Sequence, residues 1–204
     1  MLRVINIATL KRASLMNGQN IFGLISVAVF TVFCHFLSTR YFSKSQQQQS
    51  ADYDSVRLAA VLERFAFDCA SLISIHGAWR ASEGNLGEVP PVMPLPQFPA
   101  DTVWKNLDLT LVDRLLRFEN DVRISETVIQ ADYRHLEYDE YPLEPSAQAG
   151  LMGYRAYVLA QDLRAKYPAI GTASNIYPWD FVSILKKQHD LKIAEYASWN
   201  SNLE

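Results

Sequence analysis

Cysteine is scarce in this sequence of 204 residues, which contains only two. Cys34 lies in a long apolar run, and Cys69 lies in the more polar part of the chain that comes after it. If the run is embedded in a membrane, the two thiols cannot form a disulfide within one chain. The sequence therefore predicts neither a disulfide-stapled fold nor a zinc site built on cysteines.

Glycine is also scarce, at eight residues, and no glycine-rich phosphate-binding loop is present. The sequence contains neither the G-x-S-x-G motif of hydrolases nor the H-E-x-x-H motif of metalloproteases. These absences leave no residue to assign as catalytic, as a cofactor ligand or as a metal ligand. We therefore expect no cofactor and favour a non-catalytic role, and we keep a membrane-tethered enzyme as an alternative.

Acidic residues are missing from the first part of the chain, where Asp52 is the first to occur. Five of the 19 basic residues precede Ala51, so the chain from Ala51 onward has 14 basic and 22 acidic residues, a formal charge of −8. An acidic body repels polyanions, and we expect no nucleic-acid partner. A basic N-terminal part followed by an acidic body suits a domain held off an anionic membrane surface.

One long uncharged run, Asn20 to Ser38, stands out (NIFGLISVAVFTVFCHFLS). Its 19 residues are just enough for a helix to cross the hydrocarbon core of a bilayer, and a helix satisfies its own backbone there. A cleaved signal peptide would need small residues at the cut, and the run ends without an A-x-A pattern. We expect a transmembrane helix over 20–38 that contacts membrane lipid, with a signal peptide or a buried core helix as alternatives.

Basic residues near the run indicate its orientation. Arg3, Lys11 and Arg12 precede it, whereas Arg40 and Lys44 come closely after it. The small excess on the N-terminal side favours a cytoplasmic N-terminus. The sequence thus predicts a single-pass protein, in a bacterial inner membrane, with an extracytoplasmic C-terminal body.

Two short segments flank the predicted anchor. The basic tail, residues 1–19, is partly amphipathic, and it either lies on the membrane surface or forms a disordered tail. The connector, residues 39–52, contains four consecutive glutamines, which suit a flexible linker. Glutamine is also a good helix former, and no Gly or Pro occurs between Gly23 and Gly77. We therefore prefer one continuous helix from the membrane into the body.

The acidic body, residues 53–204, has no strand pattern and no internal repeat, and its apolar periodicity is helical. The first predicted helix covers 53–80, and two apolar rows on it form one face, which Val61 and Ile75 widen. These rows are Leu58, Phe65, Leu72 and Trp79, and Leu62, Cys69 and His76. Five prolines in 81–100 predict an irregular crossover loop packed along the bundle, with a polyproline docking ligand as the alternative.

Three more helices complete the prediction. Asp101 is predicted to cap a helical segment that ends near His135. A break between Asp108 and Thr110 is expected to divide this segment into a short helix and a long one. Thr110 and Asp113 resemble a capping box at the start of the long helix. The next helix is predicted over 146–166, and the last over 179–199. The apolar residues at helical spacing in the first segment are Trp104, Leu107, Leu111, Leu115, Phe118, Val122 and Ile129.

The third and fourth predicted helices have less regular faces. Leu151, Tyr154, Val158, Gln161 and Ala165 are expected along one stripe of the third helix, and Ala147, Gly150 and Gly153 mark the tightest helix crossing. The last helix is expected to bury Phe181, Ile184, Leu185, Gln188, Leu191 and Ala194, and to expose Lys186, Lys187 and Lys192. The overall prediction is an all-α fold, with one N-terminal transmembrane helix followed by a roughly four-helix bundle with a Pro-rich crossover loop.

Three side-chain groups merit a functional test. Cys69 and His76 are two helical turns apart, too far for a nucleophile and its base, and we expect a buried cysteine and a hydrogen-bonded core histidine. An oxygen-rich group near one helix end suits a divalent cation, but it lacks the glycine of a calcium loop and favours a solvated turn. The third group predicts a surface with ion pairs from Glu119 to Arg123 and from Arg117 to Asp121. The oxygen-rich group is Asp132, His135, Glu137, Asp139 and Glu140, and the third group is Glu119, Asp121 and Glu126.

The sequence favours a non-catalytic module that mediates protein–protein interaction or assembly at the membrane. Its partner is an unknown protein, including a second copy of the chain. The candidate interaction patch is an acidic, tyrosine-rich turn: Glu137, Tyr138, Asp139, Glu140 and Tyr141. A membrane-anchored sensor domain that binds a small ligand is the alternative.

Overall fold

The structure is a computed structural model, and it describes residues 7–83, 85, 93, 96–135, 142–168 and 179–201. Side chains are described within these ranges from Lys44 onward, except at positions 135 and 200. The chain divides into two compact units, Met1–Gln48 and Gln49–Glu204. The helical bundle lies in the second unit.

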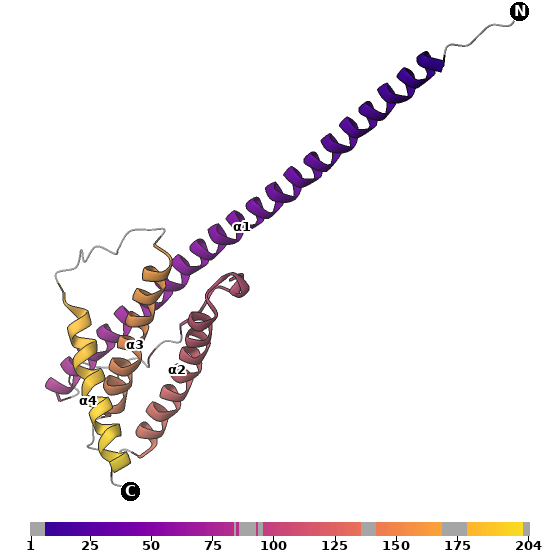
Figure 1. Cartoon of the computed structure of the whole chain (residues 1–204). Helices are drawn as coiled ribbons and strands as arrows, with labels where there is room; N and C mark the ends of the chain where they lie inside the picture. Colours follow the sequence, from indigo (N-terminus) through magenta and orange to yellow (C-terminus); the bar gives the residue numbers. More distant parts are fainter. Residues whose placement is uncertain are drawn as a thin grey trace, which may run out of the picture. The chain divides into compact units, whose positions relative to one another are not determined.

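Four α-helices and one 3₁₀ turn make up the described part of the chain, which contains no strand (Figure 1). They are α1 (Ile7–Ala81), the turn η1 (Trp104–Asn106), α2 (Leu109–His135), α3 (Glu144–Lys166) and α4 (Phe181–Ser201). The predicted all-α class is confirmed. Residues 44–52 of the connector are helical, as preferred over a flexible linker.

The predicted transmembrane helix, residues 20–38, lies outside the residues whose side chains are described. Among the helices that are described with side chains, none is both long and apolar enough to cross a membrane.

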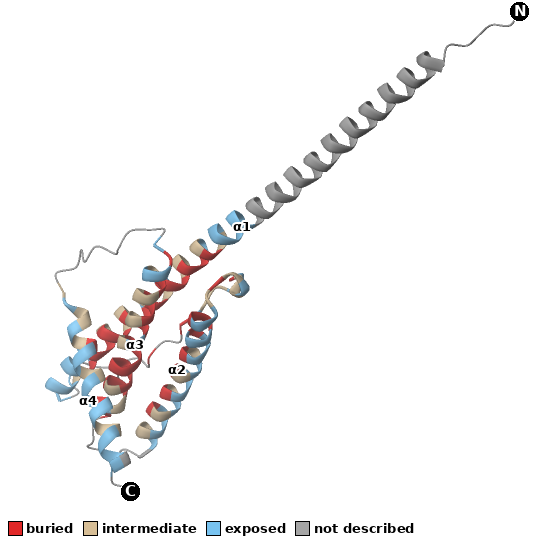
Figure 2. Cartoon of the chain, viewed as in Figure 1, coloured by how far each residue is buried: buried red, intermediate tan, exposed pale blue. Residues whose placement is uncertain are grey.

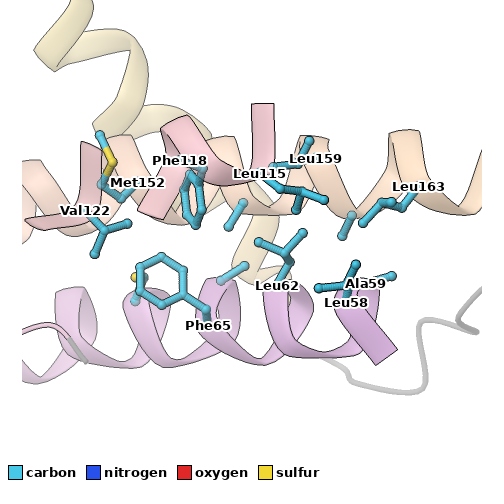
Figure 3. Close-up of a cluster of buried hydrophobic side chains, with 14 of the residues drawn as sticks. Leu58, Ala59, Leu62, Phe65, Leu115, Phe118, Val122, Met152, Leu159 and Leu163 are labelled. Atoms are coloured by element: carbon cyan, nitrogen blue, oxygen red, sulfur yellow. The ribbon is translucent and has the colours of Figure 1, made fainter. Parts of the chain in front are cut away.

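The core of the second unit lies between α1, α2 and α3. Figure 3 shows Leu58, Leu62 and Phe65 of α1 facing apolar side chains of α2 and α3. Phe65 packs edge-on against Phe118 of α2, with ring centroids 5.6 Å apart. On the other side, Phe67 of α1 packs edge-on against Phe181 of α4 at 5.8 Å. Buried residues line the facing sides of α2 and α3, and the outer face of α2 is exposed (Figure 2).

The apolar rows predicted on α1 are largely confirmed. Leu58, Leu62, Phe65, Cys69, Leu72 and His76 are all buried. Ile75, however, is 48% exposed, so it does not widen the buried face as predicted. The helix passes through Gly77 and ends at Ala81, where Glu83 takes a left-handed backbone conformation with φ of 53°.

Asp108, not Asp101, caps α2. Its Oδ1 accepts hydrogen bonds from the backbone N–H groups of Thr110 (3.0 Å) and Leu111 (3.3 Å), and Thr110 lies inside the helix rather than capping it. The prediction for Asp101 was wrong because its carboxylate instead forms a two-bonded pair with Arg57 of α1, at 2.8 and 2.9 Å. The predicted break between the short turn and the long helix is confirmed.

The apolar positions predicted on α2 are confirmed: Leu107, Leu111, Leu115, Phe118, Val122 and Ile129 are buried, and Trp104 is half-buried. In the proline-rich loop, Met93 and Pro96 are buried, and Phe98 packs edge-on against Trp104 at 6.1 Å. The described part of the loop is therefore packed against the bundle as predicted, and the remaining residues of 84–95 lie outside the described ones, apart from Asn85.

Two of the three small residues predicted at a tight helix crossing, Gly150 and Gly153, do lie close against neighbouring helices. A Cβ atom at Gly150 would lie 2.1 Å from Cβ of Gln188 on α4. At Gly153 it would lie 2.6 Å from Leu185 of α4 and 2.7 Å from Cys69 of α1. Glycine is required at both positions because neighbouring helices already fill the space of a side chain.

The stripe predicted on α3 was mostly wrong. Ala165 is exposed, Tyr154, Val158 and Gln161 are half-buried, and only Leu151 is buried. Because α3 packs against three other helices, buried positions occupy most of its circumference, and no single stripe describes them. The buried positions include Ala149, Met152, Ala156, Leu159, Ala160 and Leu163.

The inward face of α4 was also partly mispredicted. Leu191 is 57% exposed and Ala194 is exposed, whereas Lys192 is only 2% exposed. Leu185 and Lys192, two turns apart, are the buried positions among the described residues of this helix. A lysine on the buried face needs charged partners, and its partners come from two helices.

Candidate functional site

A groove of about 750 Å³ lies over α3, between α2 and α4. Its apolar part is formed by Phe118, Val158 and Leu159, and its polar part contains three arginines. The lining residues are Arg114, Arg117, Phe118, Asn120 and Asp121 of α2, Tyr154, Arg155, Val158 and Leu159 of α3, and His189 of α4. This size lies within the range of small-molecule and cofactor pockets in proteins.

Two reciprocal ion pairs hold α2 and α3 in register along this groove. Arg114 of α2 contacts Asp162 of α3 at 2.7 Å, and Arg155 of α3 contacts Asp121 of α2 at 2.8 Å. Each helix supplies one arginine and one aspartate seven residues apart, two turns along the same face. The antiparallel arrangement then matches each arginine with the aspartate of the other helix.

The α4 side of the groove carries an aromatic and imidazole pair. The rings of Tyr154 and His189 have centroids 4.9 Å apart, and Nζ of Lys186 lies 5.8 Å from the Tyr154 ring centroid. His189 Nδ1 is 3.0 Å from Oδ1 of Asp190, and the other oxygen of this carboxylate accepts a hydrogen bond from Lys186. Bonds from Lys186 and His189 hold the pKa of Asp190 below its usual value, and the carboxylate stays ionised.

More basic than acidic side chains line the groove. Arg114, Arg117 and Arg155 line it together with one carboxylate, that of Asp121, which pairs with Arg155. Arg117 is the most available of the three, since its side chain is 75% exposed and its partner Asp113 lies on the same helix. Guanidinium groups bind carboxylates through paired hydrogen bonds, and the apolar part offers contact area for a side chain beside the anion.

A second polar cluster joins α3 to α4 around Lys192. Its Nζ donates to Glu144 at 2.5 Å and to Glu195 at 3.0 and 3.1 Å. Gln148 donates to Glu144 at 2.9 Å and to the Tyr196 hydroxyl at 3.0 Å. Burial lowers the pKa of Lys192, but the bonds to the two carboxylates outweigh it and leave the pKa above its ordinary value. The lysine is therefore a charged structural link.

Cys69 and His76 lie in the core as expected. Burial raises the pKa of the Cys69 thiol far above its usual value, so it is not a thiolate nucleophile. His76 is 2% exposed, and burial, together with the nearby Arg80, lowers its pKa, so the imidazole is neutral. The predicted core position of His76 is confirmed, but the predicted hydrogen bond is not, because its Nε2 has no partner among the described residues.

The acidic patch, Glu137, Tyr138, Asp139, Glu140 and Tyr141, lies outside the described residues, as does the side chain of His135. Asp132 is described, and its carboxylate accepts a hydrogen bond from the backbone N–H of Glu144 at 3.2 Å, just at the start of α3. Within the part of the chain that is described, no group of three or more possible metal ligands comes together.

The predicted surface ion pairs of α2 are confirmed in part. Glu119 pairs with Arg123 at 2.8 Å. Arg117 pairs with Asp113 instead of Asp121, because Asp121 is taken by Arg155. The sequence did contain a signal for the groove, since matching Arg–Asp spacings of seven residues occur on two helices, but it becomes visible only once α2 and α3 are known to be antiparallel neighbours.

Comparisons of the chain with protein-family models, curated proteins and solved structures found no match.

Proposed function

We propose that this protein is a single-pass, membrane-anchored helical module that binds another protein at the membrane surface. The observation that carries the proposal is the uncharged run Asn20–Ser38, with basic residues before it and an acidic helical bundle after it. This order of charge and hydropathy is typical of an anchor that presents a domain on the far side of the membrane.

The anchor is tested by extracting membranes of cells that express the full chain with alkaline carbonate. The chain stays in the membrane pellet, because removal of the run from lipid exposes a large apolar surface to water. A full-length variant with Val29→Arg and Val32→Arg puts two charges into the centre of the run and moves to the supernatant. Release of the unsubstituted chain by carbonate contradicts the anchor.

The groove over α3 is the binding surface in this proposal. Its lining combines three arginines with an apolar part, which suits a partner segment with acidic side chains and an apolar anchor residue. Arg114 and Arg155 are held by ion pairs between α2 and α3, whereas Arg117 pairs with Asp113 of its own helix, so Arg117 is the arginine that an acidic partner would engage in place of Asp113.

The binding surface is tested with a photo-crosslinking amino acid at Val158, in the groove, in the full chain in membranes. A discrete adduct forms, and Arg117→Gln reduces it at least threefold. Arg123→Gln is the matched control, since Arg123 also sits in an exposed i, i+4 ion pair of α2 but does not line the groove. Equal adduct yields in both variants contradict binding in the groove.

A ligand sensor is the second candidate, because the groove has the volume of a small-molecule site. Thermal unfolding of the full chain with a library of small anionic compounds distinguishes the ligand sensor from the protein-interaction module. Thermal stabilisation of the full chain by one compound, lost in Arg117→Gln and kept in Arg123→Gln, supports the sensor. Crosslinking to a protein without any stabilising compound supports the interaction module.

A further inference from the structure

The three arginines of the groove over α3 keep donors for a partner. Arg114 and Arg155 each form an ion pair between α2 and α3, and Arg117 pairs with Asp113 of its own helix. All three side chains remain at least partly exposed. A guanidinium group has five N–H donors, so an arginine in one ion pair can still bind a second carboxylate. The groove can therefore accept a segment with several acidic side chains.

The groove also offers apolar contact area. Phe118, Val158 and Leu159 line it, and Tyr154 adds an aromatic ring. Arginine stacks on aromatic faces, and tyrosine and arginine are among the residues most enriched where binding energy concentrates in protein interfaces. A segment that combines carboxylates with tyrosine rings would use both the charged and the apolar parts of the groove.

The chain itself contains a segment with this chemistry, the acidic patch at residues 137–141. The patch supplies three carboxylates and two tyrosine rings, and it has no basic residue. Nowhere else in the sequence do three acidic residues fall within five consecutive positions. The patch lies outside the described residues, and its sequence alone matches the charge and the apolar character of the groove.

The acidic patch cannot lie across the groove of its own chain. Arg117 is 18 residues before the end of α2 at His135, which is about 27 Å along the helix. Glu137 is two residues beyond that end and Asp139 is four. Even a fully extended chain carries these two residues only about 7 and 14 Å away from it. A groove that receives the whole patch therefore belongs to another copy of the chain.

We propose that the groove over α3 binds the acidic patch of a second copy of this chain. The patch carboxylates pair with the groove arginines, Arg117 first, because exchanging Asp113 for a carboxylate of the other copy breaks no contact between helices. The inference rests on the proposed function, since it names the partner of the groove described there. Two copies anchored in one membrane are held at a raised effective concentration, so a small contact is enough to join them.

The test is photo-crosslinking between two full-length copies that are expressed together in membranes and carry different tags. The first copy has the photo-crosslinking amino acid at Val158, and the expected adduct carries both tags. Asp139→Lys with Glu140→Lys in the second copy lowers its yield at least threefold, because two cations then repel the groove arginines. Glu83→Lys with Glu126→Lys is the control with the same change in charge, and it leaves the yield unchanged, since neither residue belongs to the patch or lines the groove.

A charge exchange separates a lost contact from a misfolded variant. Arg117→Glu in the first copy lowers the yield with the unsubstituted second copy at least threefold. The same variant gives a higher yield with the copy that carries Asp139→Lys and Glu140→Lys, because opposite charges meet again. A yield that is not restored in this pair overturns the contact between Arg117 and the patch.

The outcomes also separate this inference from the proposed function. An adduct with a different protein, and none with the second tag, overturns a second copy as the occupant and keeps the groove as a binding surface. An adduct with both tags whose yield ignores the two lysines shows that the copies meet through another surface, and it overturns the inference. The absence of any adduct at Val158 contradicts both the inference and binding in the groove.

Discussion

Lys192 of α4 donates a hydrogen bond to Glu144, the first residue of α3, with Nζ 2.5 Å from Oε1. The lysine side chain is 2% exposed, whereas Glu144 is 21% exposed. Nζ also lies 5.0 and 5.7 Å from the ring centroids of Tyr196 and Trp199. A buried lysine is tolerated here because two carboxylates and two aromatic rings replace the water it has lost.

Replacing Lys192 with alanine should destabilise the bundle by about 3 kcal/mol, because it leaves two carboxylates close together without their cation. This destabilisation is at the lower end of the range for breaking a buried ion pair, since Glu144 and Glu195 keep some contact with water. Urea unfolding followed by circular dichroism measures it. Lys186→Ala is the control, because Lys186 is exposed and its loss should not change the unfolding midpoint measurably. Equal effects of the two substitutions would show that the buried link does not stabilise the fold.

Gly150→Ala should destabilise the protein by roughly 2 kcal/mol or more, because the new Cβ would overlap Gln188 of α4 and push the two helices apart. Gly77→Ala should instead stabilise it by about 0.5–1 kcal/mol, since alanine favours a helix and nothing lies nearby. The two substitutions are chemically identical, and both occur inside helices. Thermal unfolding of both variants is the measurement, and shifts of the same sign would contradict the helix contact at Gly150.

Stability should fall on mild acidification because of His76. Burial, and then Arg80, lower the pKa of this imidazole in the folded state, so the unfolded chain binds the proton more readily. The contribution of the neutral His76 to the free energy of unfolding is fully present above the ordinary histidine pKa of about 6.5, and it declines as the pH falls below that value. Unfolding free energies at about pH 7.5, 6.5 and 5.5 give the slope. His76→Gln should flatten it, and a slope unchanged by that substitution would assign the effect to other groups.

The rows of α1 show what the sequence alone can predict. Leu58, Phe65 and Leu72 recur every seven residues, and burial of one face of a helix results from that period. Gly150 and Gly153 were informative for the same reason, since missing side chains on one face indicate a close neighbour. In both cases the signal lies within one helix and needs no knowledge of its partners.

The errors concern residues whose environment is set by another helix. Lys192 was expected in water, and it is buried because Glu144 approaches from a helix that begins 48 residues earlier. Asp101 was expected to cap a helix, and Arg57 of α1 binds it instead. The groove over α3 likewise depends on the pairing of α2 with α3. Such pairings are decided by tertiary structure, and a local pattern does not contain them.

The central claim is that the run Asn20–Ser38 carries the acidic bundle across a membrane, and a topology measurement tests it most directly. Two reporters are fused after Glu204 of the full chain, one active only outside the cytoplasm and one active only inside it. The account predicts activity of the outside reporter alone, because the basic residues on the N-terminal side hold that end in the cytoplasm. Activity of the inside reporter alone would contradict it.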